Sequence, residues 1–314
     1  MLSSKERIAS ISIYLFLAIF IKINIFNSIQ SKEINYSSKS ILNNVINNNV
    51  LAYYDEKISL LYSKIPNTVN YKVINIFQRK NPTVYTQGLY YYNNSLYESG
   101  GLYQNSTLTK MEWPSQNIIQ KINLEEKYFA EGIAVSNTNN ILYQLTYLEK
   151  EILLYSFPNL EIKTKIIMPS ELREGWGMSP GREKDEFFAT DGTEKIYILK
   201  INNDTNELKV KSYIKVTYNN KPVYRLNDLI TDGFYIYCNV YLEKVILKIS
   251  PNNGEVINVY DMQPLYEYEL NNGKLTLQEI SIGNVLNGIA YIPEKNTFIL
   301  TGKLWDYYYE VGFN

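Results

Sequence analysis

From residue 71 onward, short runs of β-branched and aromatic residues alternate with clusters of Asn, Gly, Asp and Pro. Typical apolar runs occupy residues 72–77, 142–146 and 234–240. Short runs of this composition, bounded by turn-forming residues, are typical of β-strands. Residues 71–314 are therefore predicted to form an all-β domain.

A three-residue motif recurs five times in this region, each time as a polar residue, a small or acidic residue and a large apolar residue. The copies are Gln87-Gly88-Leu89, Glu131-Gly132-Ile133, Glu174-Gly175-Trp176, Asn227-Asp228-Leu229 and Asn287-Gly288-Ile289, spaced by 44, 43, 53 and 60 residues. Each copy leads through a turn into a second strand. Repeated units of this length, each with several short strands, indicate a five-bladed β-propeller. A β-sandwich with coincidental spacing is the alternative.

The propeller predicts both a site and a way of closing the ring. The innermost strand of each blade lines the central channel, so the five polar residues of the motif are expected to meet near one mouth. The strand at residues 73–77 precedes the first motif and has no blade of its own. We expect it to complete the last blade beside residues 307–311, which closes the ring and removes exposed sheet edges.

The N-terminal region has the pattern of a targeting segment. Lys5 and Arg7 precede an apolar run at residues 8–21, which is short for a membrane span. Residues 1–30 are predicted to be a signal peptide or an uncleaved anchor, which places the protein in the secretory pathway: the ER lumen, the exterior or a vacuole. Residues 31–70 are polar and Asn-rich and are interpreted as a linker or outer decoration.

Composition narrows the possible chemistry. With 31 basic and 32 acidic residues the net charge is −1, so no electrostatic footprint for nucleic acid is present. Histidine is absent, which excludes Ser-His-Asp and Cys-His machinery and His-bearing zinc sites. Acid–base chemistry must use Glu, Asp, Lys or Tyr. Cys238 has no disulfide partner within the chain and is interpreted as a small buried hydrophobe.

Ten segments between residues 72 and 314 resemble the plant and bacterial type of glutaminyl-peptide cyclotransferase. In order they are YTQGL (85–89), LYESGGLYQNSTL (96–108), FAEGI (129–133), LYQLTY (142–147), EGWGM (174–178), ATDG (189–192), LND (226–228), CNVY (238–241), LNGIAY (286–291) and TGKLW (301–305). The resemblance implies a five-bladed propeller, in agreement with the repeats. It also implies an aminoacyltransferase that cyclises N-terminal glutamine of peptides or proteins to pyroglutamate, with N-terminal glutamate as a further candidate substrate.

The resemblance also assigns roles to residues by motif position. In the family a glutamate of the second repeat, an asparagine of the fourth and a lysine of the fifth surround the substrate; here they are Glu131, Asn227 and Lys303. The substrate-binding positions are Gln87, Phe129, Tyr147, Trp176 and Tyr241. No metal ligand is implied.

Two pocket positions and one segment depart from the family pattern. Tyr147 and Tyr241 stand where the family usually has tryptophan, so the pocket stays aromatic but gains hydroxyl groups. The usual His-Asp pair before the first motif is replaced by residues 79–81, Arg-Lys-Asn.

Glu98 and Asp191 end second strands near glycines and are interpreted as turn-formers.

The reaction requires no nucleophilic side chain. The substrate's α-amine attacks its own γ-carboxamide and ammonia leaves, so an acid–base group and an oxyanion donor suffice. Glu131, with a pKa raised by burial, is expected to carry the proton, and Lys303 with Asn227 to hold the oxyanion. Trp176 and the two pocket tyrosines would fold the substrate toward ring closure.

Two other functions remain open from the residues alone. A calcium-dependent propeller hydrolase or a glycosidase would use acidic and amide groups, and the five motif residues Gln87, Glu131, Glu174, Asn227 and Asn287 could ligate one Ca²⁺ in the channel. A non-catalytic peptide-binding propeller is the second alternative. The cyclotransferase needs no cofactor, although a structural Ca²⁺ in the channel stays possible. A monomer is expected, with membrane contact only through the N-terminal segment.

Overall fold

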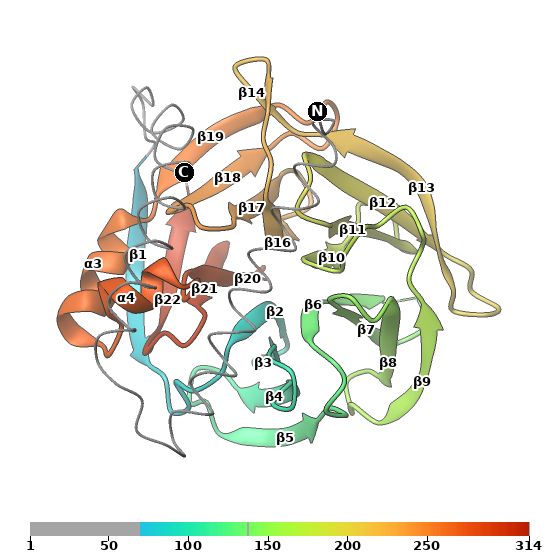
Figure 1. Ribbon diagram of the computed structural model, residues 1–314, viewed down its shortest axis with the longest axis horizontal. Coiled ribbons are helices and arrows are strands. Elements are labelled where there is room, and N and C mark those ends of the chain that lie inside the picture. The colour runs from blue at the N-terminus through green and yellow to red at the C-terminus, as the bar shows by residue number, and fades with distance from the viewer. Residues whose placement is uncertain (1–69, 137, 314) are drawn as a thin grey trace, which may run out of the picture. The chain divides into compact units, whose positions relative to one another are not determined.

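The computed structural model describes residues 70–136 and 138–313, all within the compact unit formed by residues 67–314. Five antiparallel sheets of four strands surround a central channel axis (Figure 1). The prediction of a five-bladed β-propeller is therefore confirmed. The expectations for residues 1–30 and 31–69 lie outside the described residues. None of the helices in the described ranges has the length and apolar character needed to cross a membrane.

Each blade is given with its innermost strand first. Blade 1 contains β2 (Thr86–Tyr92), β3 (Ser95–Gly100), β4 (Thr107–Glu112) and β5 (Ile118–Asn123). Blade 2 contains β6 (Ala130–Ser136), β7 (Ile141–Thr146), β8 (Glu151–Ser156) and β9 (Ile162–Ile167). Blade 3 contains β10 (Met178–Pro180), β11 (Glu186–Thr190), β12 (Lys195–Ile201) and β13 (Leu208–Lys215). Blade 4 contains β16 (Leu226–Thr231), β17 (Ile236–Val240), β18 (Val245–Ile249) and β19 (Val256–Asp261).

The last blade joins the two ends of the domain. It contains β20 (Leu286–Ile292), β21 (Thr297–Gly302), β22 (Tyr307–Phe313) and β1 (Tyr71–Gln78). The register of β1 against β22 runs from Tyr71 opposite Phe313 to Gln78 opposite Tyr307. The strand expected at residues 73–77 thus closes the ring, as predicted.

A two-stranded hairpin and two helices connect the blades. A hairpin of β14 (Thr217–Tyr218) and β15 (Lys221–Pro222) follows blade 3, while α3 (Gln263–Asn272) and α4 (Leu277–Ser281) lie between β19 and β20. The β2–β3 turn has positive φ at Asn93 (46°) and Asn94 (56°). Consecutive positive φ values are those of a type I′ turn, which asparagine tolerates well. Some of the asparagine richness therefore has a structural role.

The inner strands contact each other backbone to backbone. A Cβ added to Gly88 would lie 2.9 Å from the Cα of Gly132, and one added to Gly132 would lie closer than 3.0 Å to Gly177. One added to Gly177 would lie closer than 3.0 Å to the carbonyl oxygen of Asn227. No side chain fits at these positions, so glycine is required for the blades to approach this closely.

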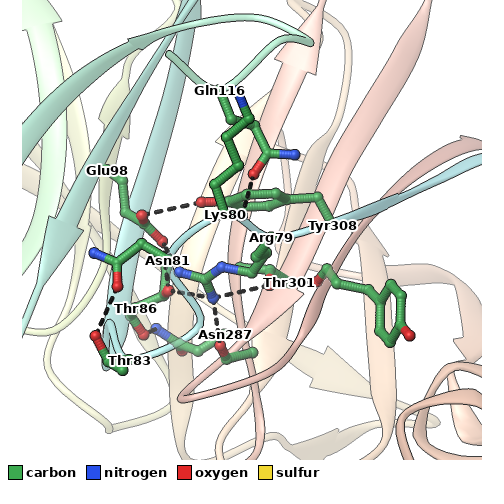
Figure 2. Close-up of polar contacts among 12 residues, drawn as sticks. Arg79, Lys80, Asn81, Thr83, Thr86, Glu98, Gln116, Asn287, Thr301 and Tyr308 are labelled. Carbon is green, nitrogen blue, oxygen red and sulfur yellow. Dashed lines mark hydrogen bonds and ion pairs between the residues drawn. The ribbon is translucent and has the colours of Figure 1, made fainter. Parts of the chain in front are cut away.

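A buried ion pair ties the start of blade 1 to blade 5 (Figure 2). Arg79 Nη2 lies 2.8 Å from Glu98 Oε1, and the two side chains are 1% and 3% exposed. Arg79 Nη1 also donates to Thr86 and Thr301, and the Tyr308 hydroxyl donates to Glu98 Oε2 at 3.0 Å. The interpretation of Glu98 as a turn-former was wrong, because Glu98 lies within β3 and neutralises a buried guanidinium.

The other residue interpreted as a turn-former does organise a loop. Asp191 follows β11, and its carboxylate accepts hydrogen bonds from the backbone N–H groups of Arg173 (3.2 Å) and Thr193 (3.1 Å). These bonds fix the loop that precedes β10 and the turn that follows β11. Cys238 is fully buried and unpaired, as expected.

Gly177→Ala is expected to lower the free energy of unfolding by about 2 kcal/mol or more, because the added methyl group meets backbone that cannot move aside. Urea unfolding followed by tryptophan fluorescence measures the change. Gly312→Ala is the matched control: its Cβ would lie 3.5 Å from Ile74 Cδ1, an ordinary contact. Equal effects of the two substitutions would contradict the tight packing of the inner strands.

Arg79→Met is expected to lower the free energy of unfolding by about 3–5 kcal/mol, because it leaves the Glu98 carboxylate buried without its cation. Thermal and urea unfolding give the value. Lys127→Met serves as the control; it breaks the exposed pair with Glu125 and should leave the free energy of unfolding nearly unchanged. The double substitution Arg79→Met, Glu98→Met should recover part of the loss, and a failure to do so would point to packing instead of charge.

Candidate active site

Four inner strands are interrupted by a β-bulge at the same place. The register shifts between Thr86 and Gly88, Ala130 and Ile133, Leu226 and Leu229, and Leu286 and Ile289. The motif residues Gln87, Glu131, Asn227 and Asn287 lie inside these bulges and are at most 5% exposed. Bulges redirect side chains and commonly lie beside functional sites. Here they place one polar residue of each of these blades at the same level of the channel.

Strand register corrects the third copy of the motif. Ile133 pairs with Gln144, three residues before Tyr147, and Met178 pairs with Ala189, three residues before Gly192. Met178 is therefore the counterpart of Ile133, and Trp176, two residues earlier, is the counterpart of Glu131. The predicted copy Glu174-Gly175-Trp176 was wrong by two residues. Blade 3 consequently contributes an indole to the ring of motif side chains instead of a carboxylate.

The residues that directly follow the second strand of a blade form another ring, at one mouth of the channel. Tyr147, Tyr241 and Lys303 come directly after β7, β17 and β21 in equivalent positions. Lys303 Nζ lies 5.0 Å from the ring centroid of Tyr85 and 4.8 Å from that of Tyr241. The cation is thus held between two aromatic faces, which attract it electrostatically.

A carboxyl group and an amine are buried together at the mouth. Glu131 is 5% exposed and Lys303 is 4% exposed. Burial raises the pKa of Glu131 well above its usual value, an effect that Lys303 partly offsets and that Glu174, Glu149 and Asp228 reinforce. Burial lowers the pKa of Lys303 to about 8, with Glu131 and Asp228 opposing the change.

One of these neighbours is a site residue that the sequence interpretation missed. Asp228 occupies the position that Gly88, Gly132 and Gly288 hold in their motifs, and it is 1% exposed. Its Oδ2 accepts a hydrogen bond from the backbone N–H of Ile289 at 2.9 Å, and burial raises its pKa well above the usual value. The departure from glycine in the fourth motif was the signal that could have identified it.

Aromatic rings form two walls beside Glu131 and Lys303. On one side the Phe129 centroid lies 6.3, 5.3 and 5.8 Å from those of Tyr85, Tyr103 and Tyr147. On the other side, Trp176 and Tyr241 are 5.6 Å apart. All five predicted substrate-binding residues therefore belong to one mouth or to its walls. Tyr85 and Tyr103 were not predicted.

Glu174 does not belong to the ring of motif side chains, because Trp176 occupies that position in blade 3. Its Oε2 accepts a hydrogen bond from Trp176 Nε1 at 2.8 Å, so it orients the indole. Glu149 accepts one from the Tyr103 hydroxyl at 2.8 Å. Both carboxylates contribute negative charge near Glu131. Across residues 70–136 and 138–313, no three acidic or cysteine side chains are grouped so that they could hold a metal ion.

These observations define a class of protein: a five-bladed propeller with a buried carboxyl–amine pair and aromatic walls at one mouth of its channel. The family model for glutamine cyclotransferase matches residues 44–313. The chain belongs to this family.

Individual relatives agree. A glutaminyl-peptide cyclotransferase of Arabidopsis thaliana is 29% identical over 231 residues, which span 73% of this chain and 67% of the plant protein. The crystal structure of Myxococcus xanthus glutaminyl cyclase superposes with a TM-score of 0.65 at 26% identity, covering 78% of this chain and 97% of that one. The structure of U3-55K, at 7% identity and a TM-score of 0.51, shares the fold alone; it covers 78% of this chain and 100% of that one.

Proposed function

We propose that the protein is a glutaminyl-peptide cyclotransferase in which Glu131 moves the proton and Lys303 stabilises the oxyanion. The observation that supports this assignment is the burial of a carboxyl group with a raised pKa beside an amine, at an aromatic channel mouth of a family member. The substrate is the N-terminal glutamine of a peptide or protein.

Glu131 acts first as a base and then as an acid. The substrate's α-nitrogen forms a bond to the γ-carboxamide carbon, and its proton passes to the Glu131 carboxylate. The same proton then goes to the departing nitrogen as the carbon–nitrogen bond breaks, so ammonia and the pyroglutamyl peptide leave and Glu131 is ionised again. A raised pKa brings the carboxyl group closer to the working pH, which favours transfer in both directions.

Lys303 and Asn227 hold the γ-oxygen as it gains charge. A lysine whose pKa is about 8 is mostly protonated at neutral pH, so it offers a full positive charge within a buried site. Donors aimed at a developing oxyanion stabilise it strongly where water is excluded. Asn227, 3% exposed in the bulge of β16, supplies an amide donor at the same level of the channel.

The aromatic walls hold the substrate's methylene groups in the conformation that closes the ring. Trp176 and Tyr241 on one side, with Phe129 and Tyr147 on the other, leave little freedom to a short side chain. Holding the amine and the carbonyl carbon in reach of each other supplies much of the rate acceleration of such a reaction.

Four further properties belong to the proposal. N-terminal glutamate should react more slowly than glutamine, because its carboxylate is repelled by Glu131, Glu149 and Glu174. We propose that the enzyme acts as a monomer, since the propeller closes its own ring. The apolar run at residues 8–21 supports delivery to the secretory pathway. Catalysis requires no cofactor.

The reaction can be tested on the purified full chain with a peptide that begins with glutamine. We expect release of one ammonia per peptide, unchanged by EDTA, and a fall of about 10²–10⁴-fold in kcat for Glu131→Gln, the usual weight of an acid–base residue. Ammonia assays and mass spectrometry follow the product. Glu183→Gln, an exposed carboxylate, is the matched control.

The other outcomes distinguish the alternatives. A folded protein that binds the peptide without cyclising it would favour a non-catalytic binding propeller. Loss of activity with EDTA, restored by Ca²⁺, would favour a calcium-dependent enzyme.

The rate should also depend on pH with two limits. As the pH rises through about 8, Lys303 loses its proton and kcat falls; as the pH falls, Glu131 is protonated and kcat falls again, at a pH above that of an ordinary carboxylate. Lys303→Arg keeps its charge, so its upper limit should move to higher pH. The substrate's amine titrates nearby but raises the rate when it loses its proton. An unchanged upper limit in Lys303→Arg would assign that limit to another group.

A further inference from the structure

Three side-chain amides and Glu131 form one directed chain of hydrogen bonds across four blades. Asn239 Nδ2 donates to Asn287 Oδ1, Asn287 Nδ2 donates to Gln87 Oε1, and Gln87 Nε2 donates to Glu131 Oε1, each at 3.2 Å. The four residues are between 0% and 5% exposed. Figure 2 places Asn287 near Thr86, below the buried ion pair.

Backbone carbonyl groups fix the direction of this chain. Asn287 Nδ2 also donates to the carbonyl oxygens of Thr86 (3.1 Å) and Gln87 (2.9 Å). A carbonyl can only accept, so Asn287 must present its NH₂ group on this side. Gln87 must then turn its oxygen toward Asn287 and its NH₂ group toward Glu131.

The far end of the chain is fixed in the same way. Asn239 Nδ2 donates to the carbonyl oxygen of Leu286 at 2.9 Å as well as to Asn287 Oδ1. Both of these partners are acceptors. The orientation of all three amides is therefore set by the peptide backbone of blades 1 and 5, and none of them can rotate alone without placing oxygen against oxygen.

We propose that Asn287 is a positioning residue of the reaction: it holds the Gln87 amide so that one oxygen of Glu131 always accepts a hydrogen bond and the other is free for the amine proton. This inference rests on the proposed function of Glu131. Asn287 does not touch the substrate in this scheme but acts through Gln87.

The hydrogen bond from Gln87 acts on the pKa of Glu131 in the opposite direction to burial and to the neighbouring carboxylates. Burial and the carboxylates of Glu149, Glu174 and Asp228 favour the protonated form, and Lys303 favours the ionised form. A donor on a carboxylate oxygen stabilises the ionised form and lowers its pKa. If Gln87 turned its oxygen toward Glu131, that aid would be lost, and a larger part of the enzyme would be unable to accept the substrate's proton at neutral pH.

The test uses Asn287→Ser, which is neutral and loses the amide, and Asn287→Asp, which keeps the shape but has no donor when ionised. Both should raise the acid limit of the pH–kcat profile by about one pH unit, lower kcat at neutral pH by about tenfold and leave KM nearly unchanged, in line with loss of one hydrogen bond to a charged group. The infrared pH titration of the Glu131 carboxyl, isolated as a difference from Glu131→Gln, should shift by the same amount.

A double substitution separates positioning from general damage. In a Gln87→Met protein, Asn287→Ser should produce no additional shift of the acid limit or of the infrared titration. An equal shift in both backgrounds, or no shift in a folded Asn287→Ser protein, would overturn the proposal. Gln116→Ala is the matched control, because it removes a buried amide bonded to the Gln78 carbonyl and the Lys80 N–H, away from the channel motifs; it should lower stability only.

The infrared measurement needs no substrate, so this inference and the proposed function can fail separately. A wild-type protein that does not cyclise glutamine, but whose Glu131 titration shifts with Asn287→Ser only when Gln87 is present, would refute the function and retain the amide chain. Normal cyclisation of glutamine by the wild-type protein, together with a Glu131 titration that Asn287→Ser does not shift, would support the function and refute the role of the amide chain.

Discussion

The contact of inner-strand backbones around the channel is the constraint on which the site depends. Because Gly88, Gly132 and Gly177 have no Cβ, the main chains of adjacent blades can touch, and no side chain would fit between them. The motif residues next to these glycines are thereby brought within hydrogen-bond distance of the neighbouring blade. Hydroxyl groups complete the arrangement: Ser99 donates to the Glu131 carbonyl at 2.5 Å and Thr190 to that of Asn227 at 2.8 Å. Each channel residue is held by the blade beside it.

This close packing buries Glu131 and Lys303, and their burial explains the direction of their pKa changes. Burial disfavours charge on both Glu131 and Lys303, so the pKa of the acid rises and that of the amine falls until both lie nearer neutrality. Their mutual attraction limits both changes. A chain without histidine can therefore adjust its acid–base chemistry through the opposed pKa changes of one carboxyl group and one amine. The buried pair of Arg79 and Glu98 is a structural tie instead, and Thr86 and Tyr308 donate hydrogen bonds to the Glu98 carboxyl group.

The sequence-based prediction succeeded where the pattern is local and failed where two local patterns compete. The five repeats, the all-β class and the closing strand follow from short apolar runs and their spacing. The third motif was misplaced because Glu174-Gly175 and Trp176-Gly177 both fit the pattern, and only the pairing of Met178 with Ala189 decides between them. Glu98 was wrongly predicted to form a turn, because no sequence motif links it to Arg79 and only folding brings the two side chains together.

What the sequence determined by itself is the number of blades, the closing of the ring and the residue types available for chemistry, because each of these is written in neighbouring residues or in composition. The resemblance to a family added which of those residues to examine. Only the tertiary structure decided how they act on one another. The amide chain joins Gln87 to Asn287, which are 200 residues apart, and the opposed pKa changes of Glu131 and Lys303 depend on shared burial. Distance and solvent exclusion arise when the ring closes, and no local pattern encodes them.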